Sequence, residues 1–119
     1  MTKKKKIEEN KLDLRKVAEH FPTYLILRFI FEAYCGLDIK CIFKHKQENI
    51  WVVVFTWDHF CKGRLQGIEK LLKQLDASIE IVNFEVYPSG NEVEVELFIG
   101  IKNKHKKKDL DDMIERCFG

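Results

Sequence analysis

The chain has 119 residues, of which 45% are hydrophobic and 34% are charged, and its net charge at pH 7 is +2. This length fits a single hydrophobic core, and the composition excludes the fibrous and intrinsically disordered classes of protein. The small net charge also departs from the strongly basic balance that is typical of nucleic-acid-binding domains.

Residues 1–10 are polar and rich in lysine, which predicts a flexible tail ahead of a single α+β domain over residues 11–119. The longest apolar run, residues 24–34, is far shorter than the roughly 20 residues that a membrane-spanning helix needs. The N-terminus has no apolar signal sequence. We therefore expect a cytoplasmic protein without a membrane span, in which the cysteines are reduced thiols.

Two helices are predicted at the start of the domain. Apolar residues at helical spacing begin after Asp13, and Pro22 is expected to end this helix because the residue before a proline avoids the α region. A second helix, apolar on most of its surface, is expected from Thr23 to about Cys35. Gly36 is its predicted C-terminal cap.

The hydrophobic period then shortens to two, which predicts a hairpin. Ile39, Cys41 and Phe43 are expected to face the core. Lys40 and Lys44 alternate with them and are expected on the outer face of the sheet. The letters KQEN supply a turn before a second strand begins.

A further helix, hairpin and helix complete the domain. Asp58 is predicted to cap a helix through GRLQGIEKLLKQLD, residues 79–101 form a hairpin around PSGN, and Asp109 is predicted to cap a closing helix. The order α-α-β-β-α-β-β-α predicts a ferredoxin-like, or permuted ferredoxin-like, four-stranded antiparallel sheet with helices on one face. Period two puts Glu92, Glu94 and Glu96 on the other face, where they can pair with lysines across strands.

The second strand of the first hairpin is apolar on both of its sides. Trp51, Phe55 and Trp57 share one side, which suits a protein interface if it points outward and the core if it points inward. The residues predicted to contact a partner are Lys40, Lys44, Trp51, Phe55, Trp57, Glu94 and Glu96.

The sequence shows no recognisable catalytic or metal-binding spacing. Cys35, Cys41, His45, His59 and Cys61 lack the close ligand pairs of zinc sites, and residues two apart, such as His59 and Cys61, do not meet on a helix. Phosphate-binding glycine loops are also absent. We therefore predict a protein that is not an enzyme, with no metal, no cofactor and no small-molecule substrate.

Nucleic acid binding is the alternative function. Lysines gather at two places, but the strand signature of RNA-recognition sheets is absent and the acidic row would repel phosphates. The residues that would serve this alternative are Lys3, Lys4, Lys5, Lys6, Lys104, Lys106, Lys107 and Lys108.

Residues 27–101 resemble the globular domain of the PilO and GspM families, which are accessory proteins of type IV pilus and type II secretion machines. The likeness lies in AYCGLDI, where a helix ends at glycine before a strand, in IEKLLKQL, and in the closing strands IEIVNFEVYPSGNEVEVEL. It implies a non-catalytic scaffold subunit that forms a homodimer or pairs with a protein partner. Those families carry a transmembrane helix that this chain lacks. The chain is therefore either a cytosolic relative in a pilus, secretion or DNA-uptake machine, or a protein that shares only the topology.

Overall fold

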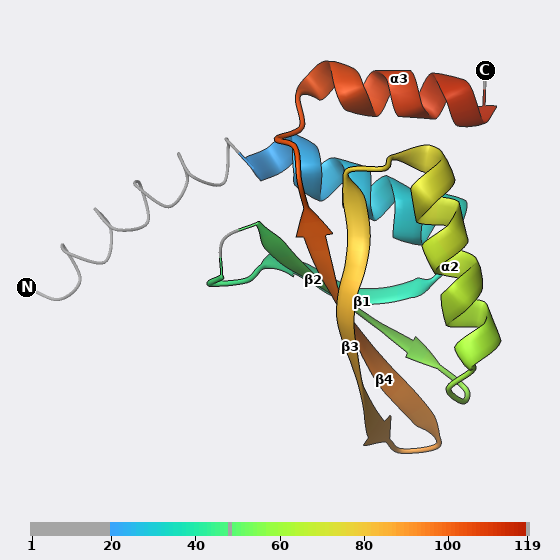
Figure 1. The fold of residues 1–119 in the computed structure, drawn as a ribbon. Helices are drawn as coiled ribbons and strands as arrows, with labels where there is room; N and C mark the ends of the chain where they lie inside the picture. The colour runs from blue at the N-terminus through green and yellow to red at the C-terminus, as the bar shows by residue number, and fades with distance from the viewer. Residues whose placement is uncertain (1–19, 48, 119) are drawn as a thin grey trace, which may run out of the picture. The chain divides into compact units, whose positions relative to one another are not determined.

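A computed structural model describes residues 20–47 and 49–118, which form two compact units (Figure 1). The helical unit contains residues 20–26 and 105–118, and the sheet unit is Leu27–Lys104. They give the predicted α+β fold with a four-stranded antiparallel sheet. The expected tail over residues 1–10 and the start of the helix after Asp13 lie outside the described residues. None of the helices in the described part has the length and apolar character to cross a membrane.

The helical unit combines helical residues 20–26 with α3 (Lys107–Phe118). The helix passes through Pro22 instead of ending there, because the fixed φ of proline, about −65°, is itself helical. Asp109 lies inside the first turn of α3, where its carboxylate accepts a hydrogen bond from the backbone N–H of Lys106 at 2.7 Å. Because the helix already begins at Lys107, Asp109 is not the N-cap that the sequence predicts.

In the sheet unit, the second predicted helix ends as η1 (Phe29–Tyr34), a π-helix. Gly36 follows with φ at +67°, a left-handed conformation that glycine adopts without steric cost, which confirms it as the C-terminal cap. The backbone N–H of Leu37 donates to the carbonyl oxygen of Phe31 at 3.0 Å. This bond closes the end of η1 and directs the chain into the first strand.

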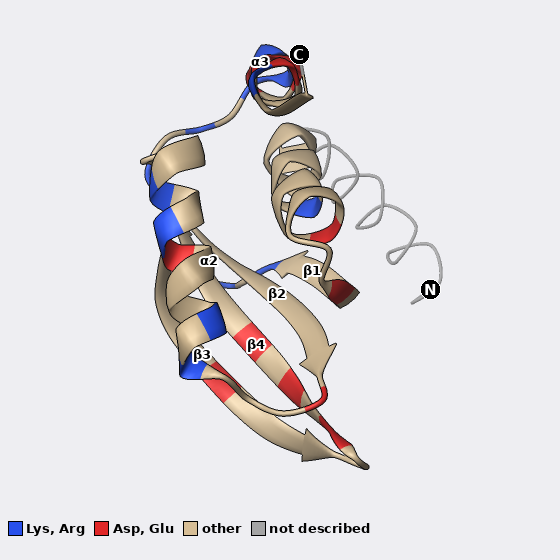
Figure 2. Ribbon diagram, turned by 90° about the vertical axis from the view of Figure 1, so that its right-hand side faces the viewer, with Lys and Arg blue, Asp and Glu red and all other residues tan. Residues whose placement is uncertain are grey.

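The sheet has the strand order β1-β2-β4-β3 and all neighbours are antiparallel. α2 (Lys62–Leu75) lies on one face, which we call the inner face (Figure 2). The side chains of α2 that are buried recur at the predicted helical spacing: Leu65, Ile68 and Leu72. The strands are β1 (Asp38–Lys44), β2 (Ile50–Trp57), β3 (Ile79–Ser89) and β4 (Glu92–Ile101).

α2 begins later than the sequence suggests, since its N-cap is Cys61 and not Asp58. The residues just before α2 pack on the sheet instead of capping the helix. Phe60 stacks on Phe84 of β3 with ring centroids 5.5 Å apart and also contacts Trp57. These aromatic contacts hold the start of α2 against the inner face.

A bulge in β1 changes the face on which several residues lie. The pairing with β2 shifts between Ile39 and Cys41, so Cys41 and Phe43 are exposed while Ile42 enters the core. The prediction that Cys41 and Phe43 face the core is therefore wrong. The same shift moves Lys44 to the side of its partner, Trp51.

Candidate functional site

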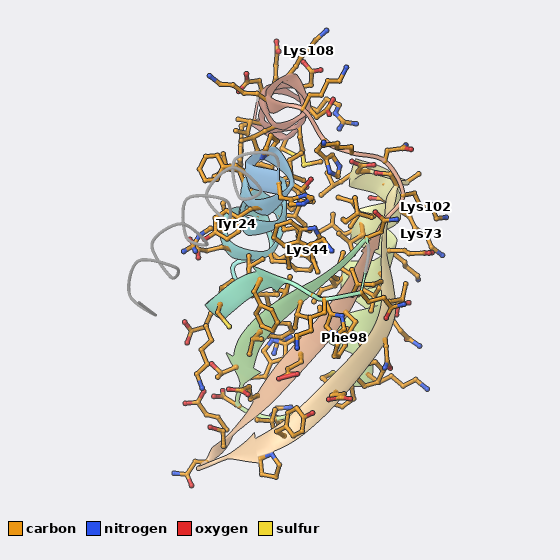
Figure 3. All side chains as sticks on the ribbon, turned by 90° about the vertical axis from the view of Figure 1, so that its left-hand side faces the viewer. Tyr24, Lys44, Lys73, Phe98, Lys102 and Lys108 are labelled. Atoms are coloured by element: carbon orange, nitrogen blue, oxygen red, sulfur yellow. The ribbon has the colours of Figure 1, made fainter. Side chains whose placement is uncertain are left out.

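The outer face of the sheet, opposite α2, carries an apolar row that crosses three strands. Figure 3 labels one member of this row, Phe98. Phe43, Val52 and Phe98 are direct cross-strand neighbours in this row. The Phe43 side chain is 46% exposed, whereas Val52 is 1% exposed because its neighbours cover it. The His45 ring meets Phe98 edge-on, with centroids 5.9 Å apart, and extends the row beyond β1.

A second bulge carries the apolar surface onto β3. The pairing of β3 with β4 shifts between Ile81 and Asn83, and Val82 of this bulge is half exposed. Its side chain covers Gly100, where an added Cβ would lie 3.0 Å from Val82 Cγ1. Gly100 therefore makes room for Val82 on the outer face.

One end of the outer face is acidic. Glu85 and Glu96 are direct cross-strand partners, and Glu94 lies beside Tyr87 in the next pair. Removal from water raises the pKa of Glu96 above its ordinary value, and the charges of Glu85 and Glu94 raise it further. We call Glu85, Glu94 and Glu96 the acidic end.

Tyr87 is part of the same arrangement. Its hydroxyl donates a hydrogen bond to the carboxylate of Glu85. This bond, followed by partial desolvation and the nearby carboxylate charges, raises the pKa of Tyr87 to about 12. The phenol is therefore a neutral hydrogen-bond donor at neutral pH, and it partly offsets the crowding of negative charge.

Lys40 reaches this acidic end from the far side of β2. Lys40 Nζ lies 2.6 Å from Glu94 Oε1, so an ion pair joins β1 to β4 across the intervening strand. Beside it, the Thr56 hydroxyl donates to Asp38 Oδ2 at 3.3 Å. The hydrogen bond to Glu94 and its charge raise the pKa of Lys40.

The predicted contact residues separate into three groups. Lys40, Glu94 and Glu96 lie on the outer face, as the alternation predicts. Trp51, Phe55 and Trp57 are 5%, 0% and 5% exposed and point to the inner face, so they form core and not free surface. Lys44 turns to the hairpin, where its ammonium group donates to the carbonyl oxygens of His45 and Gln47, each at 3.1 Å.

Several residues of this face could not be assigned from the sequence alone. Phe43 was expected inside the core because nothing in its strand marks the bulge. Phe98, Glu85 and Tyr87 follow an outward period of two, which is a usable signal once the register of β3 and β4 is known.

The lysine groups of the nucleic-acid alternative are described in part. Lys3–Lys6 lie outside the described residues, while the four others are exposed. Lys104 belongs to the sheet unit, and the remaining three stand at the start of α3. Nucleic acid binding stays a prediction.

The thiols and histidines that the sequence offered for a metal site all lie in the sheet unit: Cys35, Cys41, His45, His59 and Cys61. Within residues 20–47 and 49–118, no three His, Cys, Asp or Glu side chains come together to hold a metal ion. Burial raises the pKa of the Cys35 thiol, which favours its neutral form. Cys41 is exposed on β1.

The chain matches no family model, no curated protein and no solved structure. The likeness to the PilO and GspM families therefore stays a prediction.

Proposed function

We propose that this chain is a non-enzymatic interaction subunit that pairs with a second copy of itself through the outer face of the sheet. The observation that supports the proposal most directly is the apolar row of Phe43, Val52 and Phe98, which lies on the face opposite α2. A half-exposed aromatic ring set among apolar neighbours and rimmed by charge has the arrangement of a protein contact surface.

The distribution of charge favours a second copy as the occupant. The acidic end lies near the β3–β4 turn, whereas the exposed Lys46 and Lys102 lie near the β1–β2 turn at the opposite end of the strands, where Lys102 Nζ also lies 4.0 Å from Glu80 Oε1. A two-fold axis through the apolar row sets the acidic end of one copy against the lysines of the other. Such a pairing matches opposite charges at both rims and buries the apolar rows at the centre.

The topology supports the same family of folds that the sequence suggests. Moving the first strand of a β-α-β-β-α-β ferredoxin-like order to its end gives α-β-β-α-β-β, which is the order from η1 to β4. A permuted ferredoxin-like domain and a scaffold role, as the PilO and GspM resemblance implies, are parts of this proposal.

Sedimentation velocity over a concentration series tests the pairing. The unaltered chain is expected to form dimers, and Phe43→Asp is expected to raise the dissociation constant about tenfold or more because it buries a charge at the centre of the interface. Phe21→Asp is the matched control, since Phe21 is 49% exposed but belongs to the helical unit.

Circular dichroism must show that both variants keep the fold. A chain that stays monomeric at all concentrations would contradict the proposal. Dimers that persist unchanged in Phe43→Asp would contradict it too, and would point to pairing through the free edge of β3.

A further inference from the structure

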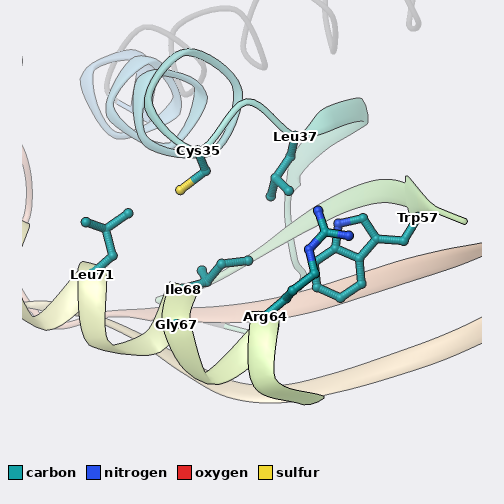
Figure 4. A pocket seen from close by; sticks show the side chains of 7 residues that line it. All are labelled: Cys35, Leu37, Trp57, Arg64, Gly67, Ile68 and Leu71. Atoms are coloured by element: carbon teal, nitrogen blue, oxygen red, sulfur yellow. The ribbon is translucent and has the colours of Figure 1, made fainter. Parts of the chain in front are cut away.

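The inner side of the sheet unit contains a cavity that the proposed pairing does not use. It lies between the end of η1 and the first half of α2 and has a volume of about 250 Å³ (Figure 4). Leu37, Ile68 and Leu71 give it apolar walls, and the Cys35 thiol, kept neutral by its raised pKa, adds to them. α2 forms one wall of the cavity, and this wall is open at Gly67, where an added Cβ would meet nothing within 4 Å.

A second cavity of about 250 Å³ adjoins the first and shares Leu37, Trp57 and Arg64 with it. Its wall is polar and acidic, because it includes the carboxylates of Asp38, Asp58 and Glu92. Together the two cavities present an apolar compartment and an acidic compartment that meet at Trp57 and Arg64.

Trp57 provides an independent sign that a polar group belongs at this junction. Its side chain is 5% exposed, and the buried indole N–H has no hydrogen-bond partner among the described residues. The nitrogen-bearing edge of the indole turns toward Leu37 and the Arg64 guanidinium in Figure 4. A buried donor without an acceptor is costly and rare in native proteins, so its position marks a place where an acceptor atom would be stabilised.

Arg64 adds a positive charge at the same place. Its guanidinium carbon lies 4.4 Å from the centre of the Trp57 ring, and a cation held over an aromatic face is oriented in advance. The indole N–H and the guanidinium are both donors only, so they suit an acceptor group such as a carboxylate.

We propose that these joined cavities bind a free α-amino acid with an aliphatic side chain. On binding, the ligand's carboxylate moves the exposed Arg64 side chain aside and accepts hydrogen bonds from Arg64 and from Trp57 Nε1, which is covered in the free protein. Its ammonium group faces Asp38, Asp58 and Glu92, and its side chain fills the apolar compartment. A simple fatty acid would bring no cation to the exposed carboxylates of the acidic compartment, and a metal ion would leave the indole N–H without an acceptor. This inference goes beyond pairing through the outer face and does not depend on it.

The two tryptophans of the chain allow a direct test by two-dimensional ¹H–¹⁵N NMR of the full-length protein. Titration with L-leucine is expected to move the indole N–H signal of Trp57 in a saturable way and to leave that of Trp51 in place. N-acetyl-leucine, which lacks the ammonium group, and leucinamide, which lacks the carboxylate, are each expected to bind about tenfold or more weakly.

Two variants separate binding from folding. Gly67→Leu is expected to fill the apolar compartment and abolish the shift while α2 stays intact, because leucine favours helix more than glycine does. Arg64→Gln is expected to weaken L-leucine binding about tenfold or more. A Trp57 signal that does not respond to L-leucine would overturn the proposal. So would equal binding of leucinamide, which would instead indicate the amino end of a peptide.

Discussion

Lys40 of β1 and Glu94 of β4 form an ion pair, with Nζ and Oε1 2.6 Å apart, although β2 separates their strands. Lys40 lies in the bulge near the start of β1, and the bulge keeps its side chain on the outer face. From there the side chain reaches across β2 to Glu94. The pair places one positive charge beside three carboxylates, and it links the edge strand to the acidic end.

We expect Lys40→Gln to lower the melting temperature slightly at low salt, because the acidic end loses its cation. The pKa of Lys40 is raised in the folded protein, so its stabilising effect is complete below the ordinary lysine pKa and is lost as the pH rises through the raised value. Thermal unfolding at neutral pH in low salt and in about 1 M salt checks this, since high salt should remove the difference. An equal difference in both salts would mean that packing, and not charge, causes the loss.

Glu96→Gln is expected to stabilise the protein at neutral pH. Desolvation and the charges of Glu85 and Glu94 raise the pKa of Glu96, so the free energy of unfolding falls as the pH rises from the ordinary glutamate pKa to the raised one. Denaturant unfolding should give a gain of about 0.2–1 kcal/mol at neutral pH and none at a pH below both values. Glu69→Gln, at an exposed site on α2, is the control and should change nothing. A gain that persists in acid would rule out the charge explanation.

Tyr87 should titrate above the ordinary range of a tyrosine phenol. Its hydrogen bond to Glu85 is the main cause that raises its pKa to about 12, and Glu85→Gln weakens that bond by replacing the charged acceptor with a neutral amide oxygen. Ultraviolet absorbance titration of tyrosinate should show one late step in the unaltered chain and its movement toward about 10 in Glu85→Gln. If the late step stays in place in this variant, Glu85 is not the group that raises the pKa of Tyr87.

Much of the fold follows from sequence patterns that are local. The helical spacing of α2, the cap at Gly36 and both hairpins are predicted because each depends on residues close together in the chain. Pro22 is different, since the sequence predicts a helix end there and the helix continues through it, which the helical φ of proline permits.

The candidate site was only partly predictable, because it depends on strand order and bulges. β2 is apolar on both sides since it lies between β1 and β4, so neighbouring side chains cover Val52 and Val54 while Phe55 enters the core. No pattern in the sequence states which strand is central. The bulge near Cys41 likewise cannot be recognised from the alternation of polar and apolar residues in β1, although it exposes Phe43.

The difference between core and surface aromatics can be measured. Phe55 is fully buried on the inner face, so Phe55→Ala is expected to lower the free energy of unfolding by about 3–5 kcal/mol. Phe43→Ala removes a half-exposed ring and is expected to cost much less, about 1 kcal/mol, when the chain is dilute and monomeric. Urea unfolding of both variants at one low concentration checks the contrast. Similar losses would mean that the outer face is packed like the core.

The two glycines at Gly36 and Gly67 should respond in opposite directions to the same substitution. Gly36 has φ at +67°, so Gly36→Ala forces a side chain into the left-handed region and should destabilise the fold by about 1–2 kcal/mol. Gly67 lies within α2 with open space around it, so Gly67→Ala should stabilise the fold by about 0.5–1 kcal/mol.

Urea unfolding of both alanine variants checks this pair, with unchanged m-values as the sign that the denatured states are comparable. Loss of stability in Gly67→Ala would show that the cavity wall is closer than the structure places it. It would then also weaken the case for a ligand at that position, because the apolar compartment depends on the space that Gly67 leaves.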